Sequence, residues 1–127
     1  MARAFVCPGQ GAQSIGMGKG LAEAFPEAKA VFEEVDEALG FDLSGLIWEG
    51  DLDSLTLTEN AQPALMATSL AAFRALEASG ASIENADYVA GHSLGEYSAL
   101  AIAGAFSVGD AARLLRARGR AMQAAVP

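Results

Sequence analysis

Residues 90–99 read AGHSLGEYSA, and within them Gly91, Ser93 and Gly95 form the pattern G-x-S-x-G. Where a strand ends abruptly and turns straight into a helix, Cβ atoms two residues on either side of the turn collide. Glycine at both positions removes that collision. The pattern therefore predicts a nucleophile elbow, which lifts the Ser93 hydroxyl clear of the sheet beside the N–H groups of a helix N-terminus.

The sequence on either side of this turn has the expected periodicity. Residues 87–91 (DYVAG) form a short apolar run, typical of a strand that is buried on both faces. Residues 94–106 repeat apolar side chains at helical spacing, and Glu96 lies in the first turn, where the helix dipole favours an anion. A serine at such a turn is either a nucleophile or a structural residue, and this order of elements favours the nucleophile.

Length and composition indicate one domain with a packed core, since the chain has 127 residues of which 52% are hydrophobic. The formal net charge is −8, with 8 basic and 16 acidic residues. This balance argues against a nucleic-acid partner, because neutralising phosphates requires clustered Lys and Arg. The single Cys7 excludes an internal disulfide, and the absence of a metal-ligand motif predicts no metal site.

The charge-free apolar runs 62–73 and 97–108 are shorter than the roughly 18 to 20 apolar residues that a membrane span requires. We therefore expect buried helices there and no contact with a membrane. The motif CPGQG at 7–11 begins too early to leave room for the apolar segment of a signal peptide. These features together predict a cytoplasmic protein.

Strands and helices alternate along the chain. Residues 3–7 (RAFVC) predict a first buried strand, which a glycine-rich loop follows. Apolar periodicity and terminal residues predict helices over 26–39, 61–79 and 108–125. This order predicts an α/β fold with a mainly parallel sheet, although only two of its strands can be recognised.

The glycine-rich loop after the first strand does not fit a dinucleotide-binding motif, because Ser14 occupies the third glycine position of G-x-G-x-x-G. Such a loop also directs backbone N–H groups at a developing oxyanion. Like Ser93, it lies at the carboxyl end of its strand, where ligands bind in open α/β sheets. We therefore expect an oxyanion hole formed by the backbone N–H groups of Gln10 and Leu94.

Arg118 differs from the other arginines of the last predicted helix, because we expect its side chain to project from the middle of the apolar face. Its neighbours at three and four residues are Leu114, Leu115, Ala121 and Met122. The other arginines of this helix, expected to form a solvated stripe, are Arg113, Arg116 and Arg120. A buried guanidinium needs an anion. That anion is either an Asp or Glu of the chain or a substrate carboxylate, which arginine binds with two parallel hydrogen bonds.

Four motifs, in order, resemble those of the malonyl-CoA:acyl carrier protein transacylase family. They are CPGQGAQ at 7–13, QPAL at 62–65, GHSLGEYSAL at 91–100 and ARGRAMQ at 117–123. The resemblance implies transfer of a malonyl group from malonyl-CoA to the phosphopantetheine thiol of acyl carrier protein, in fatty acid biosynthesis. The reaction passes through a malonyl-serine ester. It uses a coenzyme A thioester as substrate and no permanently bound cofactor.

The resemblance also implies roles for individual residues. Ser93 matches the nucleophile, and Arg118 matches the arginine that binds the malonyl carboxylate. Gln10 and Leu94 match the residues whose backbone N–H groups form the oxyanion hole. Gln62 matches a glutamine near the pocket.

The general base expected for a serine nucleophile is missing from these motifs. The single histidine, His92, directly precedes Ser93, and adjacent side chains along a strand point to opposite faces. We therefore expect His92 to pack at the elbow. Cys7 also departs from the family, in which an aromatic residue is usual, without consequence for the chemistry.

In the family the base is a histidine further along the chain, after a smaller ferredoxin-like subdomain. We therefore expect residues 1–127 to form the N-terminal part of the larger, α/β-hydrolase-like subdomain of an acyltransferase, incomplete in this chain. Two alternatives remain. A patatin-like or α/β-hydrolase esterase would share the elbow without requiring a buried Arg118. The chain could instead be a non-catalytic interaction fragment or an acyltransferase module of a larger synthase.

Overall fold

The computed structural model describes residues 2–126 and contains the predicted parallel strand pair. Strand β1 (Ala4–Cys7) pairs in parallel with strand β2 (Tyr88–Gly91), so that Ala4 lies opposite Tyr88 and Cys7 opposite Gly91. Within the described residues the sheet consists of these two strands. The fold is therefore a mostly helical α/β arrangement with a small parallel sheet.

The long helices agree closely with the prediction. Helix α2 (Pro26–Leu39) and helix α7 (Val108–Ala125) have the predicted bounds, and helix α5 (Thr58–Ala78) begins three residues before the predicted start. Gly40 follows α2 with a φ of 74°, the left-handed conformation that commonly ends a helix.

Shorter elements connect these helices and had no individual prediction. They are α1 (Lys19–Ala24), α3 (Leu43–Glu49), α4 (Leu52–Thr56) and the 3-10 turn η1 (Ile83–Asn85). Helix α6 (Gly95–Ile102) follows the elbow and stops before Gly104, whose φ is 87°.

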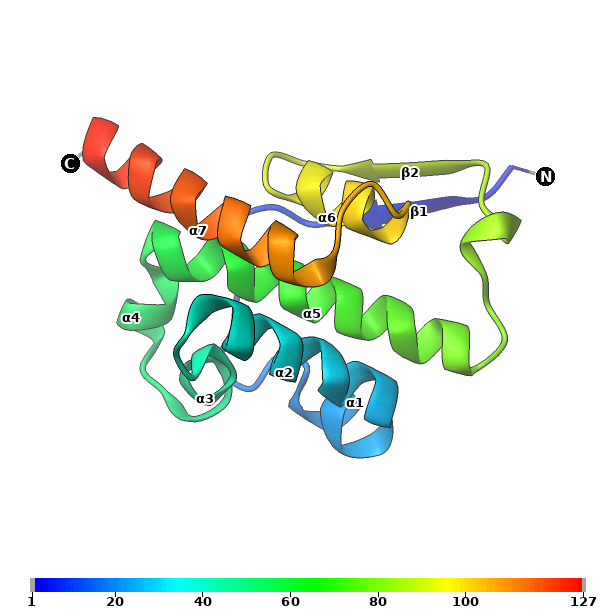
Figure 1. Ribbon diagram of the computed structural model, residues 1–127, viewed down its shortest axis with the longest axis horizontal. Coiled ribbons are helices and arrows are strands. Elements are labelled where there is room, and N and C mark those ends of the chain that lie inside the picture. The colour runs from blue at the N-terminus through cyan, green and yellow to red at the C-terminus, as the bar shows by residue number, and fades with distance from the viewer. Residues whose placement is uncertain (1, 127) are drawn as a thin grey trace.

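Helix α5 occupies the centre of the molecule. Figure 1 shows the two strands and α6 along one side of it, with α7 and α2 packed against its other surfaces. Its side chains are buried around most of its circumference, as its apolar sequence predicts. Even so, none of the helices in residues 2–126 combines the length and apolar character needed to span a bilayer.

Within residues 2–126 the sheet is covered on one face, so the prediction that residues 87–91 form a strand buried on both faces is wrong. Phe5 and Cys7 face the core, where the rings of Phe5 and Phe73 meet edge to face with centroids 5.4 Å apart. Val6 and Tyr88 point the other way and are 74% and 67% exposed. The apolar runs of both strands are those of a doubly covered sheet, but the described helices pack against one face.

The glycine-rich loop after β1 is fixed at its far end to α3. The indole N–H of Trp48 donates to the Met17 carbonyl oxygen at 3.0 Å, and the Gly16 N–H donates to the Ile47 carbonyl oxygen at 2.8 Å. The Trp48 ring also packs edge to face on Phe32, with centroids 4.9 Å apart. The loop therefore runs from β1 past the elbow to the layer formed by α2 and α3.

Candidate active site

The backbone of Ser93 confirms the predicted elbow. Its φ of 56° makes Ser93 the one left-handed residue other than glycine in residues 2–126. This conformation costs about 1 to 2 kcal/mol for a residue with a Cβ, and such strain is concentrated at functional sites. A Cβ on Gly91 would overlap the backbone of Gly95, so the first glycine of the motif is required by the turn itself.

The loop after β1 packs directly against the elbow. A Cβ on Gly95 would lie 2.5 Å from the Cys7 carbonyl oxygen, and a Cβ on Gly9 would lie 2.7 Å from the His92 carbonyl oxygen. In addition, the His92 N–H donates to the Cys7 carbonyl oxygen at 3.3 Å. The carboxyl ends of the two strands therefore meet at one edge of the sheet, as predicted.

The guanidinium of Arg118 joins three elements at this edge. Its Nη1 donates to Gln62 Oε1 on α5 at 2.7 Å, and its Nη2 donates to Ser93 Oγ at 3.1 Å. Its central carbon lies 5.4 Å from the ring centroid of Tyr97 on α6, within the range of a cation–π interaction. The structure thus brings together Ser93, Arg118 and Gln62.

Gln62 has a fixed amide orientation. Its side chain is fully buried, and its Nε2 donates to the sulfur of Met122 at 3.2 Å while its Oε1 accepts from Arg118. Tyr97 and Met122 had no predicted role. Their spacing in the sequence could have indicated both residues. Tyr97 lies four residues after Ser93 and Met122 lies four residues after Arg118, which is about one helical turn in each case.

The charge of Arg118 is not neutralised by the described part of the chain. No Asp or Glu oxygen of residues 2–126 forms an ion pair with its guanidinium. The internal ion pair that the sequence left open is therefore not formed there. Both hydrogen-bond partners of Arg118 are neutral, so a positive charge stands beside the Ser93 hydroxyl without a counter-ion.

The faces of α7 differ from the prediction. Its buried stripe follows mainly small residues, namely Val108, Gly109, Ala111, Ala112, Leu115 and Gly119. Leu114 and Met122, expected beside Arg118 on the apolar face, are 47% and 42% exposed. Arg118 is half-buried at the edge of the apolar face rather than in its middle. The cause is packing, because small side chains let α7 lie close against α5 along this line.

Arg116 is also placed differently from the prediction of a solvated side chain. Its side chain is only 18% exposed, and its guanidinium carbon lies 4.3 Å from the ring centroid of Phe41. Burial lowers the pKa of the Arg116 guanidinium from its usual value. Helix α7 therefore turns two arginines, Arg116 and Arg118, towards the rest of the structure.

The two residues predicted to form the oxyanion hole lie on either side of the elbow contact. Gln10 is exposed on the loop, and its side-chain Nε2 donates to Thr58 Oγ1 at 3.3 Å. Leu94 is buried at the start of α6. Within the described residues, neither backbone N–H has a hydrogen-bond acceptor.

His92 is exposed, and no hydrogen bond joins it to Ser93 in the described part of the chain. Its ring lies over the loop after β1, since a Cβ on Gly9 would be 2.8 Å from His92 Nδ1. This position agrees with a packing role at the elbow.

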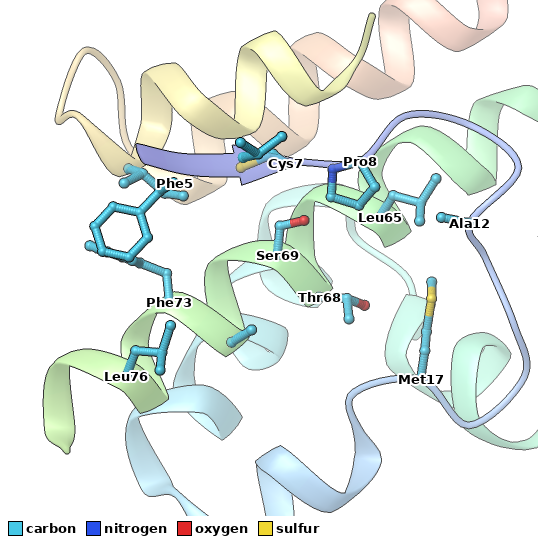
Figure 2. A pocket seen from close by; sticks show the side chains of 13 residues that line it. Phe5, Cys7, Pro8, Ala12, Met17, Leu65, Thr68, Ser69, Phe73 and Leu76 are labelled. Atoms are coloured by element: carbon cyan, nitrogen blue, oxygen red, sulfur yellow. The ribbon is translucent and has the colours of Figure 1, made fainter. Parts of the chain in front are cut away.

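A cavity of about 350 Å³ lies beside β1, next to α5 and the glycine-rich loop (Figure 2), and Ser93 and Arg118 do not line it. Its walls are mainly apolar, with Phe5 and Phe73 at one end. Cys7 also lines this cavity, and burial raises the pKa of its thiol, which therefore stays protonated at neutral pH. No cluster of three metal-ligating side chains occurs in residues 2–126.

Comparison with known proteins identifies the family. Residues 4–127 match the family model described as acyl transferase domain. The chain belongs to the acyl transferase domain family. Among curated relatives of this acyl transferase chain, the malonyl CoA-acyl carrier protein transacylase of Bacillus subtilis (strain 168) is 56% identical over 124 residues, which cover 98% of the chain and 38% of the relative.

Solved structures of acyltransferases contain the same fold. The acyl-carrier-protein-S-malonyltransferase from Bartonella henselae is 61% identical with a TM-score of 0.97, over 100% of this chain and 41% of that one. A malonyl-transacylase solved in complex with a type II polyketide synthase acyl-carrier protein is 44% identical with a TM-score of 0.93, over 100% of this chain and 40% of that one. The acyl transferase chain therefore spans about 40% of the length of these relatives.

Proposed function

We propose that this chain is the nucleophile-bearing part of an enzyme that transfers a malonyl group from malonyl-CoA to the phosphopantetheine thiol of acyl carrier protein, in fatty acid biosynthesis. The observation that carries the proposal is the Arg118 guanidinium, which contacts Ser93 Oγ at 3.1 Å and has only neutral hydrogen-bond partners among residues 2–126. A malonyl group differs from an acetyl group by a free carboxylate. A cation beside the nucleophile favours acyl groups that carry this anion.

In the first half-reaction, Ser93 Oγ attacks the thioester carbonyl carbon of malonyl-CoA. The new O–C bond forms, negative charge develops on the carbonyl oxygen, and the backbone N–H groups of Gln10 and Leu94 stabilise it. The C–S bond then breaks and coenzyme A leaves as its thiolate. Arg118 binds the malonyl carboxylate through both of its terminal nitrogens, while Gln62 supports the guanidinium from the buried side.

In the second half-reaction, the phosphopantetheine thiol of acyl carrier protein attacks the malonyl-serine ester. The products are the malonyl thioester of the carrier protein and free Ser93. A base must take the serine proton in the first step and pass it to the departing coenzyme A thiolate, and in the second step it takes the proton of the carrier-protein thiol and gives it to Ser93. Since His92 lies over the loop after β1 and no hydrogen bond joins it to Ser93 in residues 2–126, we place this base in the part of the relatives that lies outside the matched region, together with a ferredoxin-like subdomain.

The experiment is to incubate the full polypeptide encoded by the gene with malonyl-CoA and to map the acylated peptide by mass spectrometry. One malonyl group on the peptide containing Ser93 is expected, and none in Ser93→Ala. A label on another residue contradicts the proposed nucleophile. Adding acyl carrier protein should move the label to its thiol, whereas an esterase would release free malonate to water.

A further inference from the structure

Helix α7 lies close to the start of α5 at Gly119. A Cβ at this position would lie 2.6 Å from Glu59 Cα and 2.7 Å from the Thr58 carbonyl oxygen. Both atoms belong to the backbone, so no change of side-chain rotamer could relieve the contact. Glycine is less favourable than alanine inside a helix, and here it is required by the distance between the two helices.

The same turn of α5 binds the arginines on both sides of Arg118. Glu59 Oε2 accepts from Arg120 Nε at 3.0 Å and lies 3.7 Å from Arg116 Nη2. Arg116 also donates to Asn60 Oδ1 at 3.1 Å. The residues two positions before and two positions after Arg118 are therefore tied to the first turn of α5.

This contact determines the position of the α7 backbone that carries the Arg118 side chain. Gln62, which accepts from Arg118, lies three residues after Glu59 on the same face of α5. A change in the spacing or register of the two helices would move the Arg118 guanidinium relative to both Gln62 and Ser93. A long flexible side chain contributes to a reaction only when it is held in one geometry. The contact between α5 and α7 should therefore affect the reaction through the position of the Arg118 guanidinium.

We propose that Gly119 and Glu59 are positioning residues that fix the Arg118 guanidinium beside Ser93 and thereby set the preference for malonyl over acyl groups without a carboxylate. The inference rests on the proposed function. Gly119 allows the close approach of α7 to α5, and Glu59 holds the register by binding Arg116 and Arg120.

The first test is Gly119→Ala in the full polypeptide encoded by the gene. The ratio of kcat/KM for malonyl-CoA to that for acetyl-CoA should fall about 10- to 100-fold, because a displacement of about 1 Å at a reacting group can cost on the order of 100-fold. Gly20→Ala is the matched control, since Gly20 lies in helix α1 with nothing within 4 Å of its added Cβ. It should leave the ratio unchanged.

The second test, Glu59→Gln, keeps the number of non-hydrogen atoms and removes the charge that binds both arginines. The ratio should fall in the same direction by a smaller factor. Glu33→Gln is its control, because Glu33 is exposed and its one ion pair in the described part of the chain is with Lys29, at 3.8 Å. In an Arg118→Ala background neither Gly119→Ala nor Glu59→Gln should lower the ratio further.

The outcomes separate the two proposals. A wild-type enzyme without preference for malonyl-CoA contradicts the proposed function. A wild-type preference that survives in both variants, with lower melting temperatures only, overturns the positioning inference, as does a further fall in the Arg118→Ala background. If Gly119→Ala does not fold, Glu59→Gln decides the question.

Discussion

The Arg118 guanidinium donates to the Ser93 hydroxyl oxygen at 3.1 Å, so a cationic side chain touches the residue at the tip of the elbow. The two residues come from different elements, and Gln62 on a third element fixes the geometry at 2.7 Å. In the proposed reaction, binding of the malonyl carboxylate and attack on the thioester carbonyl would both take place around this one contact.

Replacing Arg118 by alanine should weaken malonyl transfer by roughly 2 to 5 kcal/mol, the range seen when one member of a desolvated charge pair is removed. Acetyl-CoA has no carboxylate, so its transfer should improve relative to that of malonyl-CoA. The measurement is kcat/KM for both thioesters in the full polypeptide. Arg113→Ala is the control, because Arg113 lies on the exposed side of α7 and pairs with Asp110. Equal loss of both activities would show that Arg118 is purely structural.

Gln62→Glu should also reduce malonyl selectivity, although it leaves Arg118 in place. A carboxylate at this fully buried position would form an internal ion pair with the guanidinium and compete with the substrate. The expected loss for malonyl-CoA is roughly 1.5 to 3 kcal/mol, the contribution of a charged hydrogen bond. Gln62→Leu, which offers no competing anion, should lose less. The reverse order would mean that Gln62 acts through its amide alone.

Ser93→Gly should be more stable than Ser93→Ala by about 1 kcal/mol. Glycine adopts the φ of 56° found at Ser93 without the penalty that a Cβ carries there. Both variants lack the proposed nucleophile, so both should lose turnover. Denaturant unfolding measures the difference, and an alanine variant of equal or greater stability would show that the elbow is unstrained in solution.

The 127-residue chain expressed alone should not turn over malonyl-CoA. Its single histidine is exposed and has no hydrogen bond to Ser93 in the described residues, so the hydroxyl keeps its proton. In serine hydrolases the loss of a triad member leaves only about 10³ to 10⁴-fold catalysis over water. The measurement is malonyl transfer by purified residues 1–127 beside the full polypeptide.

Two results of that experiment would revise the assignment of the base. Full activity that persists in His92→Ala would show that the matched region is sufficient without a histidine. Activity that disappears in His92→Ala would instead identify His92 as the base.

Helix ends and turns could be predicted from the sequence where they depend on residues close together in the chain. Pro26 and Gly40 bound α2 because proline suits a first turn and glycine suits a left-handed end. The spacing of Gly91 and Gly95 predicted the elbow because the collision that they avoid lies within five residues. The approach of Gln62 and Arg118 to Ser93 followed from resemblance to the family, since these residues lie far apart in the chain.

Features set by packing between elements could not be predicted from periodicity. The buried stripe of α7 passes through Gly119 because α5 lies close there, whereas hydropathy alone placed Leu114 and Met122 inside. Arg116 packs against Phe41, which lies 75 positions earlier in the sequence, so no local pattern predicts that contact. Whether a face of the sheet is covered likewise depends on the elements that pack around it, and the sequence of a strand does not specify these.

The contact between Trp48 and Met17 provides an optical reporter. Trp48 is the only tryptophan, and its indole N–H bonds to the loop that carries Gln10 at its other end. Its fluorescence emission therefore responds to detachment of this loop from α3 without any label and at a distance from the chemistry. A shift of the emission maximum on mixing with a thioester would record movement of the loop in real time, before any product is formed.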